Sequence, residues 1–371
     1  MSMTLLEFKS RAVTYYKAKA SVYVKSPPGM GKSGVMLEVP ALLERAFPGK
    51  KFGIATLNAA GASETDATGF LVPVKGDGAN KPRSEFTEPA WMITDEGKHM
   101  REYDGGIFFV DEMDKAPLEV KKMLGEAAHS RRFASHTLPP GWLMWGAGNR
   151  AMDRSGSTKE LDHLINRRME RDIRFDLDSQ REYMEGVGAL PELLTFVIEN
   201  VGAFDGAAVP KEQGPYLTPR SLMEVNDLLA VMRDDNNGVI PDDATTIEDC
   251  AGYVGHAQAA MLFAMIRLGM ELPPVEAIIA DPKGVKVPKR ADAQMMTAYK
   301  LAHAVDATNA GALTTFMDRK EMPQEFAVTF LRAATKAQPK LALQKDIAKW
   351  CQTNARLMAI IGRLRDNTQR A

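Results

Sequence analysis

The sequence predicts an α/β protein: a parallel β-sheet flanked by helices, built around a glycine-rich turn and followed by an all-α region. Apolar runs separated by helical segments are typical of a parallel sheet that is covered on both faces. One of these runs passes through a glycine-rich turn directly into a helix. From Ser179 onward the pattern changes to helices and loops. We therefore expect a core at residues 1–178, a helical lid at 179–272 and a helical C-terminal region at 273–371.

Composition and patterning exclude several classes of protein. No apolar run approaches the roughly 18 residues of a membrane span, and the start of the chain lacks the pattern of a signal peptide. Cys250 and Cys351 are too few and too isolated for a disulfide framework or a cysteine-based zinc site. The histidines show no paired metal-ligand spacing. We expect a protein of the reducing cytoplasm that does not enter a membrane.

The first strand, which begins at Val22, runs into a Walker A phosphate loop. The loop residues are Pro28, Gly29, Met30, Gly31, Lys32, Ser33 and Gly34. The glycines let the backbone approach phosphates closely, and the amides at the start of the following helix point toward negative charge. Lys32 can reach the β- and γ-phosphates, and the Ser33 hydroxyl can coordinate Mg²⁺. A nucleoside triphosphate is the expected ligand. Ser26 stands where the full pattern has glycine, and a glycine-rich turn without a ligand is the alternative.

The apolar strand at 107–110 ends in two carboxylates, Asp111 and Glu112. Ligands of open parallel sheets bind at the carboxyl ends of the strands, so the sheet would bring Asp111 beside Ser33 to hold Mg²⁺. Glu112 could orient and deprotonate an attacking water. Taken alone, the pair can equally be an acidic turn after a core strand. Together with the phosphate loop, it predicts a Mg²⁺-dependent ATPase with ATP as its nucleotide.

Further strands complete the predicted sheet. Residues 142–147 are apolar and lead to Asn149, whose side chain could position the water or contact the γ-phosphate. Residues 172–175 alternate like a short final strand, and a basic cluster precedes them. With a strand at 52–57, the alternation of strands and helices implies right-handed βαβ crossovers.

Five short motifs resemble the AAA+ superfamily of ATPases in their order and spacing. They are residues 27–33, 110–116, 146–149, 164–168 and 217–220. Within that superfamily the chain resembles the MoxR-like branch, which is related to the dynein-type ATPases. Residues 64–73 look like the start of the insert that this branch carries in its second core helix, which we place at about 61–89. The resemblance covers residues from about 20 to 230 and includes a hairpin at 131–139.

The resemblance implies roles for individual residues. Asn149 matches sensor 1, although Arg150 stands where a proline often follows it. Arg167 stands where an arginine finger would reach the γ-phosphate of the neighbouring subunit, and Arg168 is the alternative. Arg220 matches sensor 2, which reads the nucleotide from the lid. The alternative for Arg220 is a surface arginine that opens a helix after a proline.

Beyond the core, the periodicity predicts a series of helices, at 217–232, 246–270, 291–308, 323–335 and 341–365. From Asp281 onward, 16 Lys and Arg stand against 8 Asp and Glu. This basic region is a candidate contact surface for something acidic. The alternative is a helical domain with solvated lysines.

The MoxR resemblance implies an ATP-hydrolysing ring ATPase, a homo-oligomer with a hexamer as the expected form. It would act as a chaperone-like remodeller of a partner, often a protein with a von Willebrand factor A domain. One alternative is a nucleic-acid-handling AAA+ loader or motor that uses the basic C-terminal helices. Against it, the few aromatic residues of those helices fall mostly at apolar helical positions. The other alternative, a nucleotide switch with little turnover, is opposed by the presence of Glu112, Asn149 and Arg167.

Overall fold

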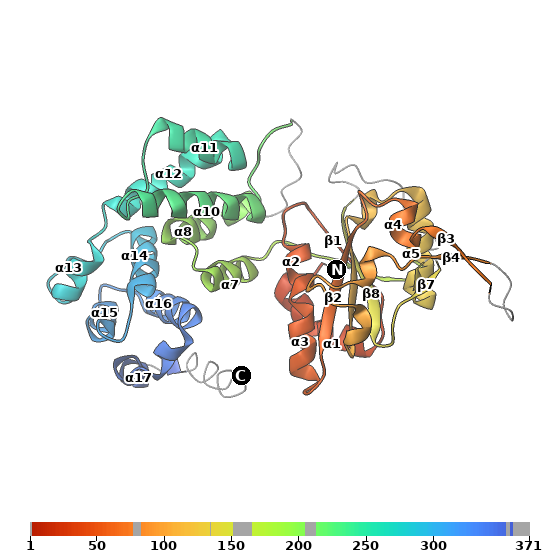
Figure 1. Ribbon diagram of the computed structural model, residues 1–371. Helices are drawn as coiled ribbons and strands as arrows, with labels where there is room; N and C mark the ends of the chain where they lie inside the picture. Colours follow the sequence, from red (N-terminus) through yellow and green to blue (C-terminus); the bar gives the residue numbers. More distant parts are fainter. Residues whose placement is uncertain are drawn as a thin grey trace. The chain divides into compact units, whose positions relative to one another are not determined.

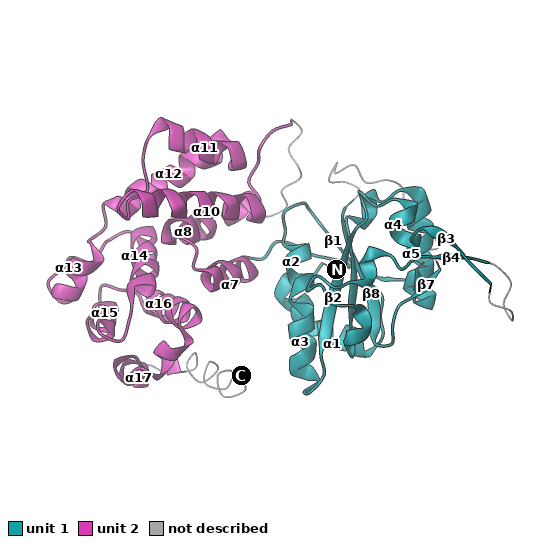
Figure 2. Cartoon of the chain, in the orientation of Figure 1, with its two compact units in different colours: residues 1–176, 206–211 teal, residues 177–205, 212–371 magenta. Residues whose placement is uncertain are grey.

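The computed structural model of the chain describes residues 2–76, 83–133, 135–150, 165–204, 213–353 and 357–358. The chain forms two compact units, one of residues 1–176 with 206–211 and one of residues 177–205 with 212–371 (Figure 2). The second unit contains both the predicted lid and the predicted C-terminal region. The division into three domains stays a prediction.

Five parallel strands form the sheet of the first unit, in the order β2-β5-β8-β1-β9 (Figure 1). Their bounds are β1 Val22–Ser26, β2 Phe52–Asn58, β5 Gly105–Asp111, β8 Trp142–Asn149 and β9 Met169–Asp172. Strands that are neighbours in the sheet are distant in the chain, and helices lie between β1 and β2 and between β5 and β8. The predicted fold class, a parallel sheet flanked by helices and followed by an all-α region, is confirmed.

Alternate side chains of the strands enter two hydrophobic cores. In β5, Phe108 and Val110 lie in one core while Ile107 and Phe109 lie in the other. The first core is covered by α5, and the second by α1, α2 and α3 (Figure 1). The bounds of these helices are α1 Leu5–Lys17, α2 Lys32–Leu37, α3 Val39–Ala46 and α5 Leu118–Ser130. Because both faces are covered, the central strands are mostly apolar, and their polar residues lie toward their carboxyl ends.

The last strand begins earlier than the sequence pattern predicts. We expected it at 172–175, but β9 spans Met169–Asp172 and pairs with β1. Glu170 of this strand forms an ion pair with Lys25 of β1 at 2.5 Å. A cross-strand charge pair of this kind stabilises a sheet without leaving an apolar signal in the sequence. Ile173, the apolar residue that suggested the later position, instead forms a bridge with Met3.

The predicted insert at 61–89 contains a short helix and a β-hairpin. The elements are α4 Glu64–Thr68, β3 Leu71–Val74 and β4 Arg83–Phe86, and the two strands are antiparallel. Figure 1 shows the hairpin extending away from the body of the unit. A second hairpin, β6 Arg132–Phe133 with β7 His136–Thr137, precedes β8 where the sequence predicts it.

The described residues of the second unit form helices and no β-strand. The helices are α7 Leu177–Val187, α8 Pro191–Glu199, α9 Val201–Phe204, α10 Pro219–Asp235, α11 Ala244–Val254, α12 His256–Met270, α13 Val275–Ala280, α14 Ala291–Ala304, α15 Ala310–Met317, α16 Gln324–Ala337 and α17 Lys345–Gln352. The helix expected at 246–270 is therefore two helices. The break falls at Gly255, whose φ of 84° favours glycine and ends α11. Among the described residues, no helix is both long enough and apolar enough to cross a membrane.

Candidate nucleotide site

The phosphate loop connects β1 to α2 and owes its shape to two glycines. Gly29 has φ 73° and Gly31 has φ 79°, values that other L-residues rarely adopt. The Met30 side chain between them is buried and anchors the loop. Gly34 lies exposed in α2 with open space around its Cα, and Pro28 is half-buried. The loop residues therefore curve in front of the helix that carries Lys32 and Ser33.

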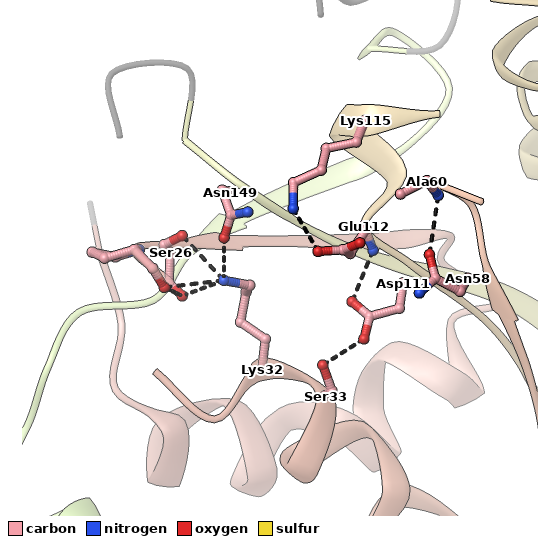
Figure 3. Close-up of polar contacts among 10 residues, drawn as sticks. Ser26, Lys32, Ser33, Asn58, Ala60, Asp111, Glu112, Lys115 and Asn149 are labelled. Carbon is pink, nitrogen blue, oxygen red and sulfur yellow. Dashed lines mark hydrogen bonds and ion pairs between the residues drawn. The ribbon is translucent and has the colours of Figure 1, made fainter. Parts of the chain in front are cut away.

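Lys32 is buried at the centre of the site. Its Nζ donates to Ser26 Oγ at 2.9 Å, to the carbonyl oxygens of Ser26 and Pro27 at 3.1 Å each, and to Asn149 Oδ1 at 3.0 Å (Figure 3). These acceptors are neutral oxygens. The ammonium group is thus fixed in position at the centre of the phosphate loop.

The carboxyl end of β5 lies beside the phosphate loop. Ser33 Oγ donates to Asp111 Oδ2 at 2.6 Å, and the Glu112 amide donates to Asp111 Oδ1 at 2.8 Å (Figure 3). A hydroxyl and a carboxylate oxygen are the hard donors that Mg²⁺ prefers. The residues predicted to hold the metal are therefore adjacent, and their donor set fits it.

Glu112 follows in a strained backbone conformation. Its φ of 49° and ψ of 36° are left-handed, which is uncommon for a residue other than glycine, and such outliers occur often at functional sites. The chain therefore changes direction at Glu112, directly after the end of β5. Its Oε1 accepts from Lys115 Nζ at 2.6 Å (Figure 3). Its side chain remains 36% exposed, so the carboxylate is accessible to water.

Asn149 reaches the loop through the register of the sheet. Ser26 lies opposite Asn149 in the pairing of β1 with β8. The preceding residue, Gly148, lets the Tyr23 side chain pack against the backbone of β8, because a Cβ there would lie 2.1 Å from the hydroxyl oxygen of Tyr23. Asn149 ends β8 at the same edge of the sheet where Asp111 ends β5. Arg150 follows outside the strand.

The two candidate fingers have opposite surroundings. Arg168 is buried: it donates to Glu170 Oε1 at 2.8 Å, and its guanidinium stacks over the Tyr23 ring at 3.6 Å. Arg167 is exposed, and its Nη1 donates to the Gly125 carbonyl oxygen of α5 at 3.0 Å. Arg168 is thus held by contacts within its own chain, whereas the Arg167 side chain is accessible at the surface.

Arg220 belongs to the second unit. It lies exposed in the first turn of α10, after the N-cap Thr218 and the proline at the first helical position. The structure therefore gathers Lys32, Ser33, Asp111, Glu112 and Asn149 at one sheet edge, and the sensor-2 role of Arg220 stays a prediction.

Two residues of the site were missed from the sequence. Ser26 was seen only as a departure from the phosphate-loop pattern, yet its Oγ accepts from Lys32. Lys115 was not considered, although a glutamate and a lysine three residues apart are a recognisable pairing signal. The first could not be read from the sequence, whereas the second could.

Comparisons with known proteins give a limited result. No family model matches the sequence, and no curated protein matches it. One similar solved structure is NtrX from Brucella abortus, with a TM-score of 0.40 and 15% identity over 91% of this chain and 68% of that one. The same protein in complex with ADP has a TM-score of 0.39 and 14% identity over 99% of this chain and 69% of that one. A RuvB mutant from Thermotoga maritima has a TM-score of 0.37 and 10% identity over 87% of this chain and 86% of that one. The likeness at these TM-scores is weak, and the function proposed below therefore depends on this chain's own residues.

The order of the parallel strands, the phosphate loop after β1 and the carboxylates at the end of β5 together give the first unit a P-loop α/β core.

Proposed function

We propose that the protein is an ATP-hydrolysing AAA+ ATPase of the MoxR type. One observation carries the proposal: Lys32, the Ser33–Asp111 pair, Glu112 and Asn149 converge at the carboxyl edge of β1, β5 and β8. A cation, a metal-ligand pair, a carboxylate and an amide are the groups that phosphoryl transfer to water requires.

Each group has a separate task in this proposal. Lys32 neutralises the β- and γ-phosphates of ATP, and the backbone of the phosphate loop binds around them. Ser33 and Asp111 would hold Mg²⁺, which supplies further neutralisation of phosphate charge. Asn149 contacts the γ-phosphate or the water. Glu112 orients that water and accepts its proton.

We propose further that hydrolysis takes place between subunits of a homo-oligomeric, hexameric ring. Arg167 would complete the site of the neighbouring subunit as its finger. Support for this choice over Arg168 comes from burial: a guanidinium that is stacked on Tyr23 and paired with Glu170 cannot extend into another subunit without leaving both partners.

The proposed task of the ring is the chaperone-like remodelling of a partner protein, with a von Willebrand factor A domain as the expected partner. The insert hairpin is a candidate contact. Its strands and flanks carry exposed apolar side chains, with Phe70 67%, Leu71 58% and Phe86 42% exposed. Apolar side chains that gather on an exposed hairpin favour contact with another protein.

Two substitutions test the site. Lys32→Ala should abolish ATP binding, because the triphosphate loses its positive partner. Glu112→Gln should bind ATP normally but hydrolyse it at least about 10²-fold more slowly. Binding is measured by calorimetry and turnover by phosphate release. Lys122→Met, on an exposed part of α5, is the control and should behave as the wild type. ATP binding by Lys32→Ala at wild-type affinity would falsify the phosphate-loop assignment.

A further inference from the structure

We propose that Lys115 is a positioning residue that restrains the proposed base. Its ion pair with Glu112 holds one carboxylate oxygen and limits basal hydrolysis, so that breaking the pair raises turnover. This inference rests on the proposed function and concerns the regulation of the same site. The proposed restraint acts on the Glu112 side chain and not on the phosphate loop or the Ser33–Asp111 pair.

The position of Lys115 is fixed by a short and well-anchored turn. Residues Met113–Lys115 form a 3₁₀ helix directly after Glu112, closed by a hydrogen bond from the Lys115 amide to the Glu112 carbonyl oxygen at 2.9 Å. Met113 and Asp114 are each 1% exposed. Lys121 of α5 also donates from Nζ to the Asp114 carbonyl oxygen at 2.8 Å. Because the backbone is held on both sides, the ion pair costs little entropy of ordering beyond the two side chains.

The ion pair occupies the carboxylate that the reaction needs. Lys115 Nζ lies 2.6 Å from Glu112 Oε1, so the ammonium group donates a charge-assisted hydrogen bond to this oxygen. The left-handed backbone at Glu112 fixes the direction in which its side chain leaves the chain, and the ammonium group of Lys115 fixes the position of its carboxylate. The Glu112 side chain must therefore distort or break this hydrogen bond before its carboxylate can move to contact a water molecule.

The expected size of the restraint follows from exposure. The Lys115 side chain is 29% exposed and that of Glu112 is 36% exposed. Pairs in contact with solvent are weak and are easily exchanged for water. Loss of the pair should therefore raise basal kcat by about two- to fivefold. An acidic group brought to Lys115 by a bound partner would have the same effect.

The experiment measures ATP hydrolysis by the full-length protein and by three variants. Lys115→Met should raise kcat by about two- to fivefold with an unchanged ATP dissociation constant. Lys115→Arg retains the pair and should remain close to the wild type. Lys122→Met is the matched control, because Lys122 pairs with Glu119 at the same i,i+3 spacing, at 3.6 Å on α5. It should leave kcat unchanged.

A double-mutant cycle separates this inference from the proposed function. In a Glu112→Gln background, Lys115→Met should no longer change the rate, because the restrained carboxylate is gone. If Lys115→Met lowers kcat or leaves it unchanged while Glu112→Gln abolishes turnover, the restraint is refuted and the base assignment stands. If Glu112→Gln retains wild-type turnover, the proposed base fails and the restraint fails with it. A rise in kcat that persists in the Glu112→Gln background would also refute the restraint.

Discussion

The two units use charged side chains in different ways. At the sheet edge of the first unit, a cation and two carboxylates converge within one small site: Lys32, Asp111 and Glu112. In the second unit, acidic and basic side chains contact one another between helices. Glu185 of α7 is buried against Arg332 of α16 at 2.6 Å, and Glu182 pairs with Lys336 at 3.3 Å. The first arrangement is the one that we propose to bind a ligand, whereas the second holds helices together.

This difference shows that a count of charges does not identify a binding surface. The C-terminal region has twice as many basic as acidic residues, 16 against 8. Yet several of its cations already have acidic partners, as in Arg290 with Asp292, Arg319 with Glu321 and Arg332 with Glu185. Where charges are paired, the local excess overstates what is available to an external partner.

The largest expected effect tests the exposed arginine of the first unit. Arg167→Ala should bind ATP but hydrolyse it roughly 10³- to 10⁵-fold more slowly, the usual loss for an arginine finger. Mixing this variant with Lys32→Ala subunits should restore some activity, because one mixed interface then combines an intact pocket with an intact finger. Phosphate release from the mixture is the measurement. No recovery despite demonstrated subunit mixing would show that Arg167 does not act on a neighbour.

The neighbouring Arg168 should affect stability instead. Arg168→Met removes a buried guanidinium together with its hydrogen bond to Glu170 and its stacking on Tyr23, so the first unit should lose about 1–3 kcal/mol of unfolding free energy. Urea unfolding followed by tryptophan fluorescence measures this, since Trp91, Trp142 and Trp145 lie in the first unit. A variant that is stable but catalytically dead would exchange the roles that we assign to the two arginines.

The buried pair of the second unit predicts a dependence of stability on pH. Burial raises the pKa of Glu185 from 4.5 to about 7, although Arg181 and Lys336 lower it in part. The folded state therefore keeps a proton that the unfolded chain loses, and stability falls as the pH rises from about 4.5 to about 7. The loss is at most about 3 kcal/mol.

Glu185→Gln should remove this pH dependence while keeping the shape of the side chain. Hydrogen exchange of the α7 and α16 amides, corrected for intrinsic rates, measures local stability at each pH. Tyr299, Glu182 and Arg332 also face the carboxyl group. An unchanged slope in Glu185→Gln would refute the assignment of this titration to Glu185.

Most of the core could be predicted because burial leaves a clear signal. Strands covered on both faces are mostly apolar, and the phosphate loop has glycines that its geometry requires, as at Gly29 and Gly31. The position of β9 could not be predicted, because its register depends on the pairing of Glu170 with Lys25 rather than on an apolar pattern. The break at Gly255 was missed because the apolar period continues across it.

Residues of the candidate site could be predicted where a sequence motif lies at the end of a predicted strand. They could be predicted less well where contacts between distant parts of the chain determine a side chain's surroundings. Lys32, Ser33 and Asp111 follow from local sequence. The different surroundings of Arg167 and Arg168 do not, because adjacent residues in a basic cluster look alike until one of them stacks on Tyr23. The same applies to Ser26, whose hydroxyl contributes to the site only because Lys32 turns toward it.

The smallest expected effect concerns nucleic acid. A motor that acts on DNA or RNA would bind it appreciably near physiological salt, lose affinity steeply as salt rises, and hydrolyse ATP faster when it is bound. We expect weak binding and no stimulation, because cations such as Lys336 and Arg332 are already paired within the second unit. The ATPase rate with and without single- and double-stranded DNA and RNA decides between these outcomes. Strong stimulation that is lost on Lys340→Glu and Lys345→Glu would overturn the remodelling proposal in favour of a nucleic-acid motor. It would also show that a few exposed lysines are enough to bind nucleic acid, although other cations of the unit are paired with acidic side chains.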